Sequence, residues 1–210
     1  MNIRKYGDPI LRAKCQEIKN FIVSEFQNKI PTAPCPSVQE AGPDRPKSKI
    51  RPSPFVRKGC PKEDSARAKA SAYLAPEIKQ LAEDMLETMH QAGGVGLAGP
   101  QIGKNWRIIV ADINQEPMAL VNPEILEKSK ELVAGEEGCL SLPGLIFKIK
   151  RPRWVVVEGC RPDDGQKIKI KAEGLLACVL QHEIDHLDGI LILDHIPFWQ
   201  RWLAIKKIKH

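Results

Sequence analysis

Two histidines and a glutamate near the carboxyl end of the chain form the pattern that most clearly suggests chemistry. Residues 181–186 read QHEIDH, so His182 and His186 are four residues apart. On a helix they project from the same face and can share one metal ion. Glu183 would lie beside that ion, where a carboxylate can take a proton from water that the ion activates. The pattern predicts a metal-dependent hydrolase, although core or surface histidines are the better interpretation of any His-x-x-x-His taken alone.

The surrounding residues predict a helix that buries this pattern. Leu175, Val179, His182 and His186 recur at steps of three or four residues, as on one face of a helix. Residues 188–189, Asp-Gly, supply a helix stop, because glycine can take the left-handed conformation of a C-terminal cap. Two ligands do not complete a site, since a catalytic metal usually has three protein ligands and one open position.

Two further segments stand out. Residues 137–144, EGCLSLPG, place Cys139 in a loop between strands from which a thiolate could reach a metal. Residues 94–101, GVGLAGPQ, form a glycine-rich turn after a helix, and its bare backbone could lie close to a ligand. Each signal is weak alone, because a lone cysteine is usually a small buried residue and the glycine pattern matches neither a dinucleotide fingerprint nor a phosphate loop.

The composition is that of one globular catalytic domain: 210 residues, 42% hydrophobic and 28% charged. No apolar run reaches membrane length and the first residues lack the apolar core of a signal peptide, so we expect a cytoplasmic protein with no membrane partner. Six cysteines in a reducing compartment favour free thiols or metal ligands over disulfides. Cys15, Cys160 and Cys178 are interpreted as small packing residues, and Cys35 and Cys60 lack the close spacing of a zinc knuckle.

The net charge of +6 is unevenly distributed along the chain. Residues 1–71 hold 15 Lys and Arg against 7 Asp and Glu. A basic surface can serve nucleic acid, an acidic partner or only solubility, and solubility is the commonest case. We therefore expect no specific DNA partner.

Composition also divides the chain. Residues 1–20 are predicted to be an ordered amino-terminal arm of the catalytic domain. Eight prolines fall between positions 31 and 61, and no helical or strand period survives there. The sequence therefore predicts a disordered, basic insertion over residues 21–70 and a catalytic metal-binding domain over 72–210.

Regular structure is expected to resume near residue 72 with an amphipathic helix that ends at Gly93-Gly94. Its apolar stripe is Ile78, Leu81, Met85 and Met89. Four strands should follow, at 107–112, 118–121, 153–158 and 166–171, with a hairpin turn at 163–165. Helix, strands and helix together predict an α+β domain.

In chain order, residues 94–101, 137–144 and 181–186 resemble the three signature motifs of the peptide deformylase family. These enzymes remove the formyl group from the starting methionine of nascent chains. Residues 3–12 and 174–189 are also similar to family sequence, so the resemblance covers about 1–20 and 72–210. It implies antiparallel or mixed β-sheets packed around a central metal-binding helix. Where the family usually has two alanines before proline, this chain has Ala98-Gly99, which adds backbone freedom next to Gln101.

The resemblance also implies a complete set of reacting groups. Cys139, His182 and His186 would hold a divalent metal with water or substrate in the fourth position; ferrous iron is the ion the family typically uses, and zinc, nickel or cobalt can replace it. Glu183 would be the general base and then the proton donor to the departing amine. The Gln101 side-chain amide and the Leu140 backbone N–H would stabilise the oxyanion.

Substrate contacts follow from the same resemblance. Val95 and Gly96 would line a groove in which an extended peptide pairs as an added strand. Leu175, Cys178 and Val179 are candidates for the methionine pocket, and could equally be plain core. The partners implied are N-formyl-methionyl nascent peptides, with transient ribosome contact through the basic segments.

Three alternatives are less favoured by the residues present, with a zinc peptidase the first of them. A zinc peptidase would need a downstream ligand, and Asp188, Asp194, His195 and His210 follow no spacing that we recognise. A non-catalytic relative that only binds peptides would not need both Glu183 and Gln101. A structural zinc site would have four ligands and no use for a carboxylate base.

Overall fold

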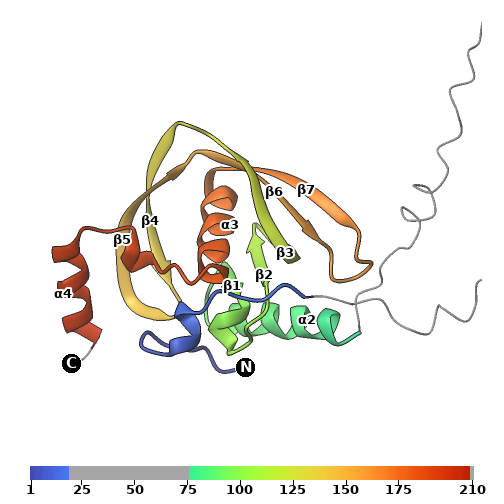
Figure 1. Ribbon diagram of the computed structural model, residues 1–210, viewed down its shortest axis with the longest axis horizontal. Coiled ribbons are helices and arrows are strands. Elements are labelled where there is room, and N and C mark those ends of the chain that lie inside the picture. The colour runs from blue at the N-terminus through green and yellow to red at the C-terminus, as the bar shows by residue number, and fades with distance from the viewer. Residues whose placement is uncertain (19–75, 209–210) are drawn as a thin grey trace, which may run out of the picture. The chain divides into compact units, whose positions relative to one another are not determined.

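The computed structural model describes residues 1–18 and 76–208, and strands are the commonest regular element there. The predicted insertion over 21–70, and the helix start near residue 72, lie outside these residues. Figure 1 labels the elements, which in chain order are η1 (Pro9–Arg12), α2 (Pro76–Gln91), β1 (Gly96–Ala98), η3 (Gly99–Ile102), β2 (Ile108–Ile113), β3 (Glu116–Lys128), β4 (Leu132–Cys139), β5 (Leu142–Pro152), β6 (Trp154–Cys160), β7 (Lys167–Glu173), α3 (Gly174–Leu187), η4 (Ile192–Asp194) and α4 (Phe198–Ile208).

Two antiparallel sheets surround the helix α3. One has five strands in the order β1-β2-β3-β6-β7, and the other is the β4-β5 hairpin. Figure 1 shows α3 in the middle, between the hairpin and the larger sheet. Ala177, Leu180, Ile184 and Leu187 of α3 form one buried cluster with apolar side chains of the larger sheet. The expected α+β fold, with antiparallel sheets around a central helix, is confirmed.

On the opposite face of the larger sheet, α2 packs against β1 and β2. Along β2, Ile109 points into the cluster with α3, whereas Ile108 and Val110 point into a second cluster with α2. This alternation is the two-residue period of a strand that is buried on both faces. The stripe predicted for α2 is confirmed, since all four of its residues are in this second cluster.

A glycine with positive φ lies at each end of α3. Gly174 begins the helix at φ +64°, and Gly189, just past its end, has φ +74°, the left-handed conformation expected of the stop signal. One part of the predicted buried face is wrong. Leu175 is 59% exposed, because it lies in the first turn of α3 where the helix borders an open cavity.

The β4-β5 hairpin was not predicted from the sequence, which indicated a loop at 137–144. Most β4 residues are exposed, so the strand shows no apolar alternation. The two strands pair from Leu132↔Pro152 to Cys139↔Leu142, with a register shift between Gly138 and Cys139. Cys139 therefore lies at the closed end of a hairpin, held by main-chain pairing, and not in an irregular loop.

Residues near the amino terminus bind segments from the rest of the domain. The N–H of Arg4 donates to the Gln101 carbonyl at 2.7 Å, and that of Tyr6 to the Ser141 carbonyl at 2.9 Å. The N–H of Cys15 donates to the carbonyl of Leu187, at the end of α3, at 2.8 Å. In this way the first residues join η3, the hairpin turn and the central helix.

The last helix, α4, packs through one narrow face. Ala204 and Ile205 belong to a cluster with residues of β5 and η4. Phe198 and Trp199, by contrast, are 82% and 60% exposed. Neither α4 nor any other described helix has the length and apolar character needed to cross a membrane.

Candidate active site

Three potential metal ligands meet at the point where α3 passes the closed end of the hairpin. The ligand atoms of Cys139, His182 and His186 all lie within 4.8 Å of one another. The Cys139 sulfur is 3.2 Å from Nε2 of His186, and the two imidazole rings are 5.0 Å apart at 79°. A thiolate with two imidazoles suits zinc or iron, so the donor set fits the metal expected from the sequence.

Glu183 lies among these residues with an incomplete set of contacts. Its side chain is buried, and Oε2 has no hydrogen-bond partner among the described residues. Burial raises the pKa of Glu183 to about 7, despite the nearby charge of His182. A carboxyl group with a pKa near neutrality is well suited to proton transfer.

The two histidines differ in their proton affinity. Burial disfavours a charged His182, but hydrogen bonds with Cys139 and Glu137 outweigh it and raise its pKa to about 10. Burial and the charge of His182 together lower the pKa of His186 to about 3. A metal ion bound here must therefore displace a proton from His182, which makes metal binding pH-dependent.

The Gln101 side chain is held by its own chain segment. Its Oε1 accepts the N–H of Ala98 at 2.8 Å, which turns Nε2 toward Cys139 Sγ, 3.6 Å away, and Ser141 Oγ, 3.3 Å away. Gln101 is 1% exposed, so this orientation is fixed by packing as well as by hydrogen bonds. An amide donor is thus aimed at the metal-ligand cluster.

Two glycines before Gln101 allow close contacts that a larger residue would prevent. A Cβ at Gly96 would overlap the Glu183 carboxylate and the Val179 side chain. A Cβ at Gly99 would lie 2.5 Å from the Trp106 carbonyl oxygen. The departure to Gly99 therefore has a steric reason, and the freedom it was expected to add near Gln101 is limited by the bond between Gln101 and Ala98.

A cavity of about 560 Å³ opens onto these groups. Of the eleven residues that the sequence and the resemblance marked, all but His186 line it, namely Val95, Gly96, Gln101, Cys139, Leu140, Leu175, Cys178, Val179, His182 and Glu183. His186 is 1% exposed and completes the ligand cluster from within the protein. The structure therefore brings together residues from β1, η3, the hairpin and α3 at one place.

A second cavity of about 510 Å³ adjoins the first. The two share Glu136, Glu137, Leu175 and Cys178 in their walls, so these residues separate one space from the other. The three residues considered for a methionine pocket do not all line the same cavities. Leu175 and Cys178 border both, whereas Val179 borders the first.

The downstream residues that a peptidase would need as a third ligand have other partners. Asp188 accepts a hydrogen bond from Arg107, and Asp194 pairs with Arg12 and Arg201. His195 contacts Asp185. His210 lies outside the described residues. Within the described chain, Cys139 is therefore the residue that joins the two histidines.

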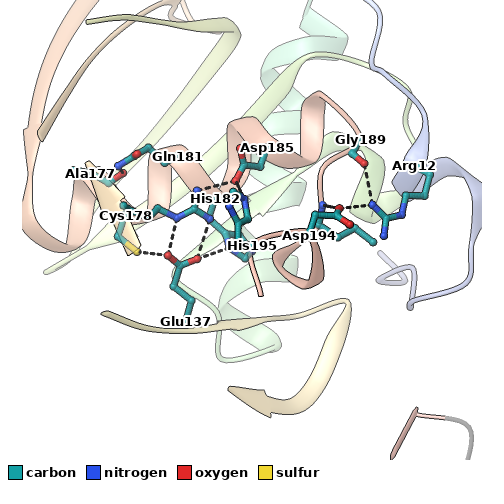
Figure 2. A network of polar contacts seen from close by, with 12 residues as sticks. Arg12, Glu137, Ala177, Cys178, Gln181, His182, Asp185, Gly189, Asp194 and His195 are labelled. Carbon is teal, nitrogen blue, oxygen red and sulfur yellow. Dashed lines mark hydrogen bonds and ion pairs between the residues drawn. The ribbon is translucent and has the colours of Figure 1, made fainter. Parts of the chain in front are cut away.

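Sequence reasoning missed the polar residues that surround His182. Glu137 Oε2 is 3.1 Å from His182 Nδ1, and Arg151 donates to both oxygens of Glu137 at 2.6 and 3.0 Å. Arg151 also donates to Asp185 at 2.7 Å. Figure 2 shows Glu137 between Cys178 and His182, with Asp185 and His195 nearby. The sequence held one indication that Arg151 is buried. It lies two residues after the apolar Ile149, so in a strand both side chains point to the same face.

Comparison with known proteins gives one consistent family. The family model described as "Polypeptide deformylase" matches residues 62–202. A peptide deformylase of Thermodesulfovibrio yellowstonii is 45% identical over 148 residues, which is 68% of this chain and 88% of that protein. One of Dictyoglomus thermophilum is 49% identical over 128 residues, 61% of this chain and 82% of that protein.

Solved structures agree with the sequence relatives. The crystal structure of peptide deformylase from Thermus thermophilus has a TM-score of 0.68 and 33% identity, covering 99% of this chain and 92% of that one. Peptide deformylase from Ehrlichia chaffeensis, solved in complex with actinonin, has a TM-score of 0.71 and 28% identity, covering 100% and 95%.

Proposed function

The chain belongs to the peptide deformylase family and shares its function, and we propose that Cys139, His182 and His186 hold the metal ion of this metalloenzyme while Glu183 transfers the protons. The observation that carries the assignment is the meeting of one thiol and two imidazoles within 4.8 Å, beside a buried carboxyl group. The reaction is hydrolysis of the N-formyl amide of formyl-methionine at the start of a new polypeptide, with release of formate.

The bound cation and Glu183 would have different roles in the reaction. A divalent cation held by the three residues would act as a Lewis acid that polarises the formyl carbonyl and activates water. Glu183 takes a proton from the water that attacks the formyl carbon. The same carboxyl group then gives this proton to the amine nitrogen as the carbon–nitrogen bond breaks.

Charge that develops on the formyl oxygen is stabilised by two donors of the protein. The first is Nε2 of Gln101, whose direction is set by the bond from Ala98 to Oε1. The second is the backbone N–H of Leu140, which lines the same cavity at the hairpin turn. Preorganised donors of this kind lower the barrier because they need no reorientation during the reaction.

The substrate peptide would lie along β1. This strand is at one edge of the five-stranded sheet, where an extended peptide can add main-chain hydrogen bonds. Val95 and Gly96 are at the start of that edge and line the cavity. Leu175, Cys178 and Val179 would receive the methionine side chain, since an apolar, flexible side chain needs an apolar wall.

The exposed face of α4 supports a transient ribosome contact. Phe198, Trp199 and Trp202 are exposed, and Nζ of Lys206 lies 3.8 Å from the ring centre of Trp202. The helix contains no acidic residue. Aromatic rings beside cations suit RNA, through stacking and phosphate contacts, and such binding would weaken steeply with added salt.

We propose ferrous iron as the ion in cells, with zinc, nickel or cobalt able to replace it. A ferrous ion beside a thiolate makes the enzyme sensitive to oxygen, because Cys139 can be oxidised. The expected result is loss of activity during aerobic storage and its retention under anaerobic conditions. Full activity after prolonged aerobic storage would instead indicate zinc or nickel.

The domain division predicted from the sequence is part of the same proposal. Residues 1–20 would belong to the catalytic domain, a role supported by the bonds from Arg4 and Tyr6 to Gln101 and Ser141. The site residues all lie outside 21–70, so replacing that segment by a short Gly/Ser linker should leave deformylation of short peptides nearly unchanged. A cytoplasmic location is the setting in which nascent chains are available.

The ligand assignment can be tested through metal content. Each of Cys139→Ala, His182→Ala and His186→Ala should lose stoichiometric metal, whereas Glu183→Gln should retain it and lose turnover. If Cys139→Ala bound metal as well as the parent protein, the three-ligand site would be wrong and a peptidase arrangement would gain support.

A further inference from the structure

Three consecutive residues near the amino terminus bind the two segments that supply the proposed oxyanion donors. The N–H of Arg4 donates to the Gln101 carbonyl at 2.7 Å. Nζ of Lys5 donates to the Leu140 carbonyl at 2.9 Å, and the N–H of Tyr6 donates to the carbonyl of the next residue, Ser141, at 2.9 Å. The hairpin turn and η3 are therefore both bound to one short segment of the chain.

This segment is itself anchored to the domain by the residues that follow it. Asp8 caps η1 by accepting a hydrogen bond from the N–H of Ile10 at 3.1 Å. Leu11, within η1, is 1% exposed and therefore belongs to the interior of the domain. The contacts of residues 4–6 thus connect the proposed oxyanion site to a fixed part of the fold.

Leu140 is held from two sides. Its side chain packs closely on Gly94, where a Cβ would lie 2.6 Å from Leu140 Cδ1. Its carbonyl accepts the Lys5 ammonium, and a charged donor makes a stronger hydrogen bond than a neutral one. A residue whose side chain and carbonyl are both held has little freedom in φ and ψ, so the direction of its N–H is restricted before substrate binds.

We infer that Lys5 is a positioning residue for the oxyanion site, because its ammonium group holds the Leu140 carbonyl and thereby directs the Leu140 N–H toward the formyl oxygen. The inference rests on the proposed roles of Leu140 and Gln101. Lys5 lines the same cavity as these two residues, so it acts at the site and not from a remote surface. Donors that are oriented in advance lower the barrier, since they need no reorientation during the reaction.

Steady-state kinetics separate this role from direct binding of the substrate by Lys5. Loss of an interaction that forms only in the transition state lowers kcat and leaves KM unchanged, whereas loss of a simple substrate contact raises KM with kcat unchanged. Lys5→Met removes the donor and keeps an unbranched apolar side chain. We expect it to lower kcat for a formyl-methionyl peptide by about 10- to 100-fold, the loss that a small misplacement of reacting groups can cause.

Two matched variants serve as controls. Lys5→Arg retains a charged donor and should restore most of the lost kcat. Lys14→Met makes the same substitution at another exposed lysine near the amino terminus, one with no hydrogen bond or ion pair to the described residues. It should leave both kcat and KM at the values of the parent protein.

A measurement without turnover tests the same role. The NMR order parameter of the Leu140 N–H bond would be measured in the zinc-loaded full chain, where rigid backbone gives about 0.85 and flexible backbone less than about 0.6. We expect the value to fall in Lys5→Met and to stay at that of the parent protein in Lys5→Arg and Lys14→Met. Metal content would be measured in parallel. Loss of metal from Lys5→Met would overturn the inference, because the effect would then act through Cys139.

The outcomes also distinguish this inference from the proposed function. Gln101→Ala, which removes an oxyanion donor outright, should lower kcat by about 10²- to 10³-fold. If it does so while Lys5→Met keeps the parent kcat and order parameter, the positioning role is overturned and the proposed function stands. A raised KM with unchanged kcat in Lys5→Met also overturns it.

Two further cases are decided by the same measurements. If the parent protein releases no formate, the proposed function fails, and an unchanged order parameter in Lys5→Met overturns the positioning role as well. Should Lys5→Met fail to fold, Lys5→Gln, with a shorter and neutral side chain, takes its place in both measurements. Parent values of kcat and of the order parameter in that variant would overturn the inference.

Discussion

Two arginines separated by one residue of the chain have similar partners and very different surroundings. Arg151, in β5, pairs with Glu137 and Asp185, and its side chain is 8% exposed. Arg153, between β5 and β6, pairs with Glu131 and Glu173, and its side chain is 50% exposed. We call these the inner network and the outer network. The inner network contacts His182 through Glu137, whereas the side-chain hydrogen bonds of Arg153 in the outer network go to Glu131 and Glu173.

The difference shows that the location of an ion pair, and not its residue types, determines its importance. Charges in the outer network are solvated with or without a partner, so the pairs contribute little. In the inner network, removal of one partner leaves a buried charge without compensation, and this is costly. Glu183 is the opposite case within the same site: among the described residues no arginine forms an ion pair with it, and burial raises its pKa.

The largest effect is expected at Glu183. Glu183→Gln preserves the shape of the side chain but removes the base, so formate release should fall by about 10²- to 10⁴-fold. Metal content should stay near that of the parent protein. Activity within a few-fold of the parent would show that this carboxyl group does not transfer the proton, and Glu131→Gln, in the outer network, serves as the unaffected control.

The next largest effect is expected on stability, when Arg151 and Arg153 are each replaced by methionine. Arg151→Met leaves Glu137 buried without its cation, and we expect a loss of about 3–5 kcal/mol in the free energy of unfolding. Arg153→Met should leave the urea midpoint nearly unchanged, because exposed pairs add little. Urea unfolding of both variants at the same pH and metal concentration checks this. Equal losses would remove the distinction between the inner and outer networks.

The pH dependence of activity should follow Glu183. Burial raises its pKa to about 7, and the base works only when ionised, so activity is present above the pKa and is lost as the pH falls through it. Below the midpoint, kcat/KM should fall by about tenfold per pH unit. Because a bound cation favours the ionised carboxylate, the midpoint in the loaded enzyme should lie below about 7. A profile that stays flat down to about pH 4.3, the ordinary pKa of a glutamate, would contradict this assignment.

The smallest effect is expected from the glycines. Gly99→Ala places a Cβ 2.5 Å from the Trp106 carbonyl oxygen, so the buried turn before Gln101 must shift. Overpacking of this kind typically costs about 1–3 kcal/mol. Gly135→Ala, on exposed β4, adds a Cβ with no heavy atom within 4 Å and should not destabilise the protein. Thermal unfolding of both variants tests the contrast, and an unchanged melting temperature for Gly99→Ala would show that the turn can adjust freely.

The central helix and the pair of histidines on it could be predicted because their signals are local. A four-residue spacing, an apolar run and an Asp-Gly stop lie within one segment, and the resemblance added Cys139. Strand β2 is a short apolar run, and β7 alternates polar and apolar residues. For these elements, neighbouring residues contain the information that fixes the structure.

The hairpin and the inner network could not be predicted in the same way. Most side chains of β4 face solvent, so no apolar period marks the strand. Glu137 and Arg151 are 14 residues apart and Arg151 and Asp185 are 34 apart, and charged side chains in a sequence give no indication of distant partners. Leu175 was placed on the wrong face because helical spacing does not show where a cavity opens.

The central claim is most directly tested by the products of one reaction. Anaerobically prepared protein loaded with ferrous iron would be incubated with a formyl-methionyl peptide and, separately, with the same peptide lacking the formyl group. Formate and new amino termini would be measured in both. We expect equal amounts of formate and of new amino-terminal methionine from the formylated peptide, and no product from the other. New internal amino termini from the unformylated peptide, without formate, would contradict the account and indicate a peptidase.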